Sequence, residues 1–259
     1  MGLWTPLHAA TVLPSYVLML GLAILARRWL ADKSYETRML PIKIIAVLLP
    51  LLEVGKQVCS VLVGYDRFSL PFHFCSIFLY ILPIMAFYRG KYAERIRCAA
   101  CACMAALLFG MLAAPALIYV EGDIRDFFTD YLAFHTVFFH ALVIFALFFV
   151  ITLDLHRSCG GWKETRFLTL FGLGFVSVAI TATYSLDTNF SLFLSPPIQE
   201  IRDALDAIKQ AIGQVPGQIL YVAVLVVLHL LLLACANYLF LLLCLIKERL
   251  VRAFRSKRA

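Results

Sequence analysis

The sequence predicts an all-α polytopic membrane protein of seven transmembrane helices, with its N-terminus outside and its C-terminus in the cytoplasm. Three observations lead to this prediction: the composition, the spacing of seven apolar segments, and the distribution of basic residues between them. Hydrophobic residues make up 63% of the 259 residues and charged residues only 15%, which differs greatly from a soluble domain. A segment of about 20 apolar residues can cross the bilayer as a helix.

The apolar segments follow one another along the whole chain. They cover residues 9–30, 41–63, 70–88, 98–119, 131–153, 167–186 and 216–246. No stretch between them is long enough to build a soluble core of its own, so residues 1–259 are expected to form a single domain. In the longest gap, apolar residues recur at helical spacing over about 197–213. This pattern predicts an amphipathic helix that either covers a pocket or lies on the bilayer.

The first three segments have recognisable boundaries. The first is too long for the apolar core of a cleavable signal peptide, and no basic region precedes it. The second is expected to end near Gly64, since glycine commonly ends helices. The third begins at Leu70, where Pro71 stands in the first turn and can loosen it.

The last four segments are separated by charged loops. The fourth contains the run AACACMAA with Cys98, Cys101 and Cys103. We interpret these small side chains as allowing close helix packing, with a metal or palmitoylation site as the alternative. The fifth segment follows Asp130, and the sixth contains FGLGF, which we also interpret as close packing. The seventh leads into a basic tail at 247–259.

Basic residues are distributed unequally between the two sides of the predicted bundle. Of the 23 Lys and Arg, 18 lie in alternate loops and in the C-terminal tail. The other side has Arg67, Arg125, Arg202 and Lys209, and Lys56 lies within a segment. The positive-inside rule therefore places the tail in the cytoplasm.

The net charge of +7 is thus a property of the cytoplasmic face, where the tail is expected to contact anionic headgroups. No nucleic-acid partner is expected. The predicted location is the plasma membrane, which is the inner membrane for a bacterial chain, or an endomembrane for a eukaryotic chain.

A small set of polar residues lies within or at the ends of these apolar segments, in the half nearest the outside. Ionisable groups in hydrocarbon cost several kcal/mol, so they usually line a cavity or a functional site. At about 1.5 Å per residue, Cys75 and His135 both lie roughly 8 Å below the outer boundary. A thiol and an imidazole at one depth are what a Cys–His nucleophile pair requires. The set comprises Glu53, Lys56, His73, Cys75, His135, His140, Tyr184, Asp187 and Asn189.

Helix geometry limits which of these side chains face one pocket. His73 and Cys75 point about 200° apart on an ideal helix, unless Pro71 loosens the first turn. His135 and His140 diverge by about 140°, so one of them is expected to serve the pocket directly. Glu53 and Lys56 share a face, and either neutralise each other or leave Lys56 to hold an anionic group.

The run LPFHFCS at 70–76 resembles the signature of YwaF-type integral membrane proteins, a family that includes the eukaryotic transmembrane protein 164. Further similar elements are the Glu53/Lys56 helix, YLAFHTVFFH at 131–140, and TNFSLFLSPP at 188–197. The second proline of the last element departs from the family pattern.

The resemblance implies an acyltransferase that moves a fatty acyl group between phospholipids, with Cys75 as nucleophile and His135 or His140 as its partner. The acyl acceptor is then a second lipid or, in a hydrolase, water. Glu53, Lys56, His73, Tyr184, Asp187 and Asn189 are the expected substrate-binding residues. Lys56, Tyr184 or Asn189 would stabilise the oxyanion or hold the phosphate. No cofactor and no metal are expected.

Three alternatives remain. The first is a transporter or small-molecule receptor that binds a polar solute through Glu53, Lys56 and the histidines. The second is a zinc site built from His73, Cys75, His135 and His140. The third is a seven-span metal hydrolase of the alkaline ceramidase type, which is disfavoured because His229 stands alone in the last segment.

Overall fold

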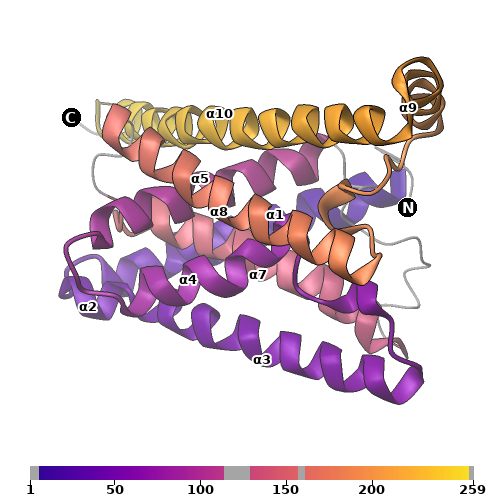
Figure 1. Cartoon of the computed structure of the whole chain (residues 1–259). Helices are drawn as coiled ribbons and strands as arrows, with labels where there is room; N and C mark the ends of the chain where they lie inside the picture. Colours follow the sequence, from indigo (N-terminus) through magenta and orange to yellow (C-terminus); the bar gives the residue numbers. More distant parts are fainter. Residues whose placement is uncertain (1–5, 114–128, 157–160, 257–259) are drawn as a thin grey trace.

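The computed structural model describes residues 6–113, 129–156 and 161–256, and every regular element in these ranges is a helix. The all-α prediction is therefore confirmed for this part of the chain. The long helices run side by side, and the two termini lie at opposite ends (Figure 1). The elements are α1 (Pro6–Leu30), α2 (Tyr35–Arg38), α3 (Leu40–Val63), η1 (Arg67–Ser69), η2 (Phe74–Ser76), α4 (Ile77–Phe87), α5 (Ala93–Ala113), α7 (Tyr131–Thr152), α8 (Trp162–Leu186), η4 (Phe190–Leu192), α9 (Gln199–Ile212) and α10 (Gln214–Ser256).

Within the described residues, six helices are long and apolar enough to cross a membrane: α1, α3, α5, α7, α8 and α10. They correspond to six of the seven predicted segments. The last part of the fourth segment, 114–119, lies outside the described residues.

The third predicted segment, 70–88, is shorter as a helix than expected. Its apolar helix covers only Phe74–Phe87, because the chain before it is extended at His73 (φ −75°, ψ 154°). Pro71 contributes no backbone N–H to a first helical turn, and it restricts the residue before it. At about 1.5 Å per residue this helix covers roughly 21 Å, against about 30 Å of hydrocarbon.

The core is built around α5, which packs against α4, α7, α8 and α10. The run from Ala99 to Ala106 is buried throughout, as the close-packing interpretation of AACACMAA predicts. Cys101 and Cys103 are buried free thiols, and Cys98 is disulfide-bonded. Gly172 of α8 lies directly against Leu233 of α10, whereas no atom of the described residues lies within 4 Å of where a Gly174 side chain would start. The packing interpretation of FGLGF therefore holds for Gly172 but is wrong for Gly174.

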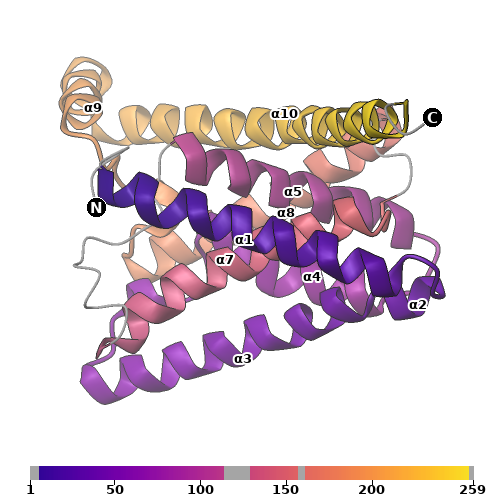
Figure 2. The same ribbon diagram turned by 180° about the vertical axis from the view of Figure 1, so that it is seen from behind.

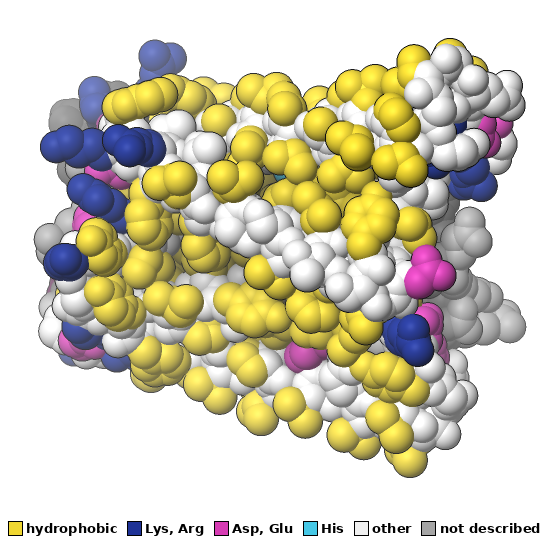
Figure 3. Space-filling view, in the orientation of Figure 1, with side chains coloured by type: hydrophobic (Ala, Val, Ile, Leu, Met, Phe, Trp, Pro, Cys, Tyr) yellow, Lys and Arg dark blue, Asp and Glu magenta, His cyan; other side chains and the backbone are white. Residues whose placement is uncertain are grey.

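Lys and Arg side chains gather at the end of the bundle where α2 and the C-terminus lie (Figure 3). We call this the basic end. Two carboxylates connect its helices: Glu36 pairs with Lys43 at 2.7 Å and with Arg89 at 2.9 Å. Hydrogen bonds from these two cations lower the pKa of Glu36. The second carboxylate, Asp154, joins Arg27 of α1 and Lys247 of α10.

The amphipathic segment predicted at 197–213 forms α9. This helix crosses the end of the bundle and packs on α10, on the side opposite α3 (Figures 1 and 2). Leu205 faces α10 and is buried, while Ile201 and Ile208 are exposed. Glu53 and Lys56 lie on α3, and the helix that α9 packs on is α10.

The last helix, α10, is 43 residues long and continues into the predicted basic tail as far as Ser256. At about 1.5 Å per residue it measures roughly 65 Å, about twice the hydrocarbon thickness. The basic residues near its end therefore extend past the apolar belt of the bundle.

Candidate functional site

A buried cluster of polar side chains begins on α3. Glu53 is only 8% exposed, and its Oε1 accepts from Lys56 Nζ and from Gln57 Nε2, both at 2.8 Å. The spacings of three and four residues put all three side chains on one helix face. Gln57 Nε2 also donates to Ser69 O at 2.8 Å, which joins α3 to η1. The expected Glu53–Lys56 ion pair is therefore present.

The second part of the cluster comes from α7, which packs along α3. His135 Nε2 lies 3.4 Å from Glu53 Oε2, an ion-pair distance without hydrogen-bond geometry. Tyr131, one turn earlier, donates its hydroxyl to Leu52 O at 3.0 Å. The tyrosine ring lies directly over Gly55, where any side chain would collide with it. The two helices thus meet closely beside the Glu53–His135 contact.

Both histidines of α7 are buried: His135 is 6% exposed and His140 is 4% exposed. His140 Nδ1 lies 2.6 Å from Thr136 O, and because a carbonyl only accepts, this nitrogen carries a proton. Among the described residues, the Nε2 atoms of both histidines have no hydrogen-bond partner. A buried polar nitrogen without a partner costs about 1–3 kcal/mol, which makes these two atoms candidates for contact with substrate or water.

Cys75 stands in η2, directly before α4. Because His73 is extended rather than helical, the ideal-helix angle between His73 and Cys75 does not apply to this segment. The first turn is loosened, as Pro71 allows. Cys75 is half-buried and lies one residue before the N-cap of α4, and the N-terminus of a helix is the positive end of its dipole.

Cys75 and His73 lie within coulombic range of both charges of the Glu53–Lys56 pair, and His140 lies within range of Lys56. In the described conformation, no hydrogen bond joins the Cys75 thiol to an imidazole of α7. His73 contacts a different region: its Nε2 lies 2.9 Å from Phe68 O, and its ring packs on Phe68 and Phe190.

Of the three predicted residues near the end of α8, Tyr184 lies in the last turn of the helix, Asp187 ends it, and Asn189 lies in the loop that follows. Asn189 Oδ1 accepts from the backbone N–H groups of Leu194 and Ser195, and its amide donates to Ser195 O. Tyr184 donates to Phe193 O. Asp187 ends α8 in the left-handed region (φ 49°) and is exposed.

This loop contacts the segment that carries Cys75. Ser191, itself at φ 49°, donates its hydroxyl to Phe72 O at 3.0 Å. Asn189 therefore supports the Cys75 segment indirectly, by shaping the loop that holds Phe72.

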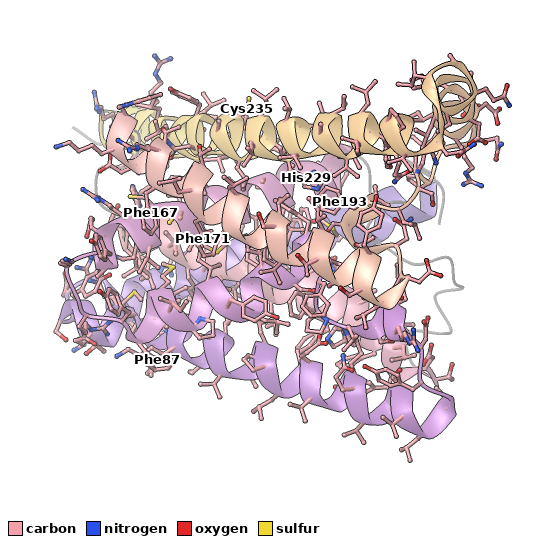
Figure 4. The ribbon with its side chains drawn as sticks, viewed as in Figure 1. Phe87, Phe167, Phe171, Phe193, His229 and Cys235 are labelled. Carbon is pink, nitrogen blue, oxygen red and sulfur yellow. The ribbon has the colours of Figure 1, made fainter. Side chains whose placement is uncertain are left out.

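Gln57, Tyr131 and Ser191 are not among the site residues predicted from the sequence. Gln57 could have been predicted, because its i, i+4 spacing from Glu53 places both side chains on one face of a helix. His229, which appeared isolated in the sequence, lies between the rings of Phe74 and Phe193, with centroids at 5.5 and 5.3 Å. Figure 4 shows His229 of α10 beside Phe193. Its position follows from helix packing, which no sequence spacing predicts.

Residues 3–242 match the model of the TMEM164 family. The chain belongs to this family. The resemblance found at LPFHFCS is confirmed, and the matched range includes the whole α3–η2–α7 cluster. No curated protein and no solved structure matches the chain significantly.

Metal ligation was one alternative for this TMEM164-family protein. Among the described residues, no three His, Cys, Asp or Glu side chains come together in an arrangement that could hold a metal ion. His73 faces Phe68 rather than α7, which separates it from the other three residues of the zinc alternative.

Proposed function

We propose that this chain is a membrane phospholipid acyltransferase with Cys75 as nucleophile and His135 as general base and acid. The observation that carries the proposal is the buried Glu53–His135 contact, at 3.4 Å, in electrostatic range of a cysteine at a helix N-terminus. A carboxylate beside the imidazole stabilises the imidazolium that forms when histidine takes a proton.

The reaction has two steps. His135 takes the Cys75 proton, and the thiolate attacks the ester carbonyl of a phospholipid. The carbonyl–oxygen bond then breaks, and the lysophospholipid oxygen leaves with the proton from the imidazolium. In the second step His135 deprotonates a hydroxyl of the acceptor, which attacks the thioester and releases the thiolate.

Other residues would assist this chemistry. Lys56, whose ammonium lies in the buried cluster, is suited to stabilising the oxyanion. His140, whose buried Nε2 has no partner, is the alternative base. The reaction requires Cys75 and the imidazole to approach, since apo geometry is often looser than that of the substrate complex. Water in place of the acceptor would give a hydrolase.

The topology that goes with this proposal has seven spans, including the short α4, and an outward-facing site. Cys75, Lys56 and His135 lie toward the end of the bundle opposite the basic end. The positive-inside rule then places the site near the outer leaflet.

Acyl transfer through Cys75 predicts a covalent intermediate. Purified protein incubated with a phospholipid that carries a labelled acyl chain should acquire label at Cys75, and hydroxylamine should remove it. Cys75→Ala should abolish labelling, and His135→Ala should slow it about 10²–10⁴-fold, the usual contribution of a general base. Cys235→Ala is the matched control, because Cys235 is an exposed free thiol on α10. Unchanged turnover in Cys75→Ala would exclude the covalent mechanism.

A polar-solute transporter or receptor is the second candidate, favoured by the buried Glu53–Lys56 ion pair with His135 beside it. That function predicts the opposite ranking of variants. Glu53 and Lys56 substitutions would then be the severe ones, and Cys75→Ala would be nearly silent.

A further inference from the structure

An open groove lies along the exposed side of α8. Its volume is about 480 Å³, within the range of pockets that bind small ligands. Over this part of α8, a white strip of backbone and polar uncharged side chains interrupts the yellow apolar surface (Figure 3). From Ser177 to Leu186 the groove follows about 14 Å of helix. Its lining consists of Phe72 and of six α8 residues: Ser177, Val178, Thr181, Ala182, Ser185 and Leu186.

The hydroxyl groups in this groove are largely satisfied within α8. Ser177 donates to Leu173 O at 2.8 Å, and Thr181 donates to Ser177 O at 2.9 Å. A hydrogen bond of this kind, to a carbonyl in the preceding helical turn, points the hydroxyl hydrogen toward the backbone. The groove therefore presents mainly methyl and methylene groups, and an apolar chain lying in it leaves these two hydroxyls paired.

One wall of the groove belongs to the segment that carries Cys75. Phe72 stands three residues before the cysteine, and its ring packs edge-on against Phe190 at 5.3 Å. Ser191 holds the Phe72 carbonyl at 3.0 Å. A molecule in the groove thus lies beside the cysteine-bearing turn.

The end of the groove away from the basic end carries a cation. Arg67 Nη1 donates to the carbonyl of Leu186 at 3.2 Å, and its side chain is exposed. No carboxylate in the described part of the chain forms an ion pair with it. Asp66 and Asp187 adjoin Arg67 and Leu186 in the sequence and are exposed, so a zwitterionic headgroup fits this end better than a multiply anionic one.

We infer that the α8 groove holds one acyl chain of a zwitterionic membrane phospholipid, whose phosphate contacts Arg67. The inference rests on the proposed function, because it supplies the ester that Cys75 attacks. Surrounding hydrocarbon removes any hydrophobic driving force, so residence in the groove depends on packing contacts and on Arg67.

The test measures occupancy in protein that carries Cys75→Ala, so that no turnover is required. The protein is reconstituted in neutral bilayers with a phosphatidylcholine whose acyl chain bears a diazirine, and cross-linked residues are mapped by mass spectrometry. Cross-links should concentrate on residues 177–186 and Phe72. Thr181→Trp, which fills the groove, should reduce them to the level of other exposed helix faces. Leu170→Trp is the control, because Leu170 is an exposed residue on the same face of α8, about 16 Å away.

A second pair of variants tests the headgroup contact. Arg67→Gln should reduce cross-linking in the groove, and Arg67→Lys should retain part of it. Arg202→Gln, which changes an exposed arginine of α9, should have no effect. Cross-links spread evenly over α1, α3 and α10, or undiminished by Thr181→Trp, would overturn the inference. Groove cross-linking without thioester formation at Cys75 in the unmodified protein would instead support the groove and reject the acyltransferase.

Discussion

At the scale of single residues, the decisive contact is between Glu53 and His135. From the sequence, Glu53 was predicted to be a partner of Lys56 or a substrate ligand, and the structure adds the imidazole of His135 to its neighbours. Glu53 therefore balances one buried cation and stands ready to balance a second when His135 is protonated. Because Glu53 lies on α3 and His135 on α7, removing the Glu53 carboxylate should change both the charge balance of the site and the stability of the α3–α7 contact.

The coupling between Glu53 and Lys56 is measurable in a double-mutant cycle. Glu53→Gln leaves Lys56 as an unbalanced buried charge, and Lys56→Met leaves Glu53 in the same condition, so each single variant should be clearly destabilised. The double variant should recover much of the loss, with a coupling free energy of about 0.5–3 kcal/mol. Thermal unfolding in one detergent or bilayer system provides the measurement. Simple additivity of the two losses would mean that the pair makes no net contribution.

At the scale of elements, the α3–α7 contact positions the site. The close approach of α3 and α7 depends on Gly55, because the Tyr131 ring lies directly over it. The Tyr131 hydroxyl then donates to Leu52 O. Small residues at helix contacts are the usual means of close approach in membranes, because lipid supplies no hydrophobic force between helices. The 70–76 segment, by contrast, is positioned by a loop: Asn189 shapes it and Ser191 bonds to Phe72.

Gly55→Ala should disturb this contact. The added methyl group must displace the Tyr131 ring, which breaks its bond to Leu52 O and costs about 1–3 kcal/mol. Tyr131→Ala combined with Gly55→Ala should lose less than the sum of the two single changes. Gly21→Ala on α1 is the control, since nothing lies within 4 Å of its missing side chain. That change should be neutral or stabilising by up to about 1 kcal/mol, as helix propensity predicts. Equal losses at Gly21 and Gly55 would contradict the packing argument.

At the scale of the whole molecule, the distribution of basic residues and the positions of the two termini are both consistent with one transmembrane orientation. The basic end carries most of the Lys and Arg side chains visible in Figure 3, and the termini lie at opposite ends (Figures 1 and 2). A chain whose ends lie on opposite sides crosses the membrane an odd number of times. Six helices have the length and composition of a span, so the short α4 is the element that would make seven.

The topology predicts how tags behave in intact cells. A tag fused before residue 1 should be accessible from outside, and a tag after residue 259 should become accessible only when the membrane is permeabilised. Antibody staining with and without permeabilisation measures both. If both tags are accessible from the same side, the number of spans is even and α4 does not cross the membrane. If only the C-terminal tag is accessible from outside, the orientation is reversed and the proposed site lies in the cytoplasmic leaflet.

Much of the candidate site was predictable from depth along the helices. Counting residues from each segment end brought Cys75 and His135 to one depth and placed Glu53 and Lys56 in the same half of the membrane. The structure brings Glu53, Lys56 and His135 into contact. Rotation about the helix axes was not predictable. Because α7 is apolar on nearly all sides, its sequence does not indicate which face meets α3.

The sequence by itself determined the family, the helical segments and the basic end, because these depend on local composition, on signature residues and on the alternation of loops. Only the tertiary structure decided that His135 meets Glu53, that α9 lies on α10 away from α3, and that Asn189 bonds to its own loop. The physical reason is that lipid accepts an apolar face in any orientation. Helix rotation is therefore set by a few close contacts between distant residues, such as Gly55 with Tyr131.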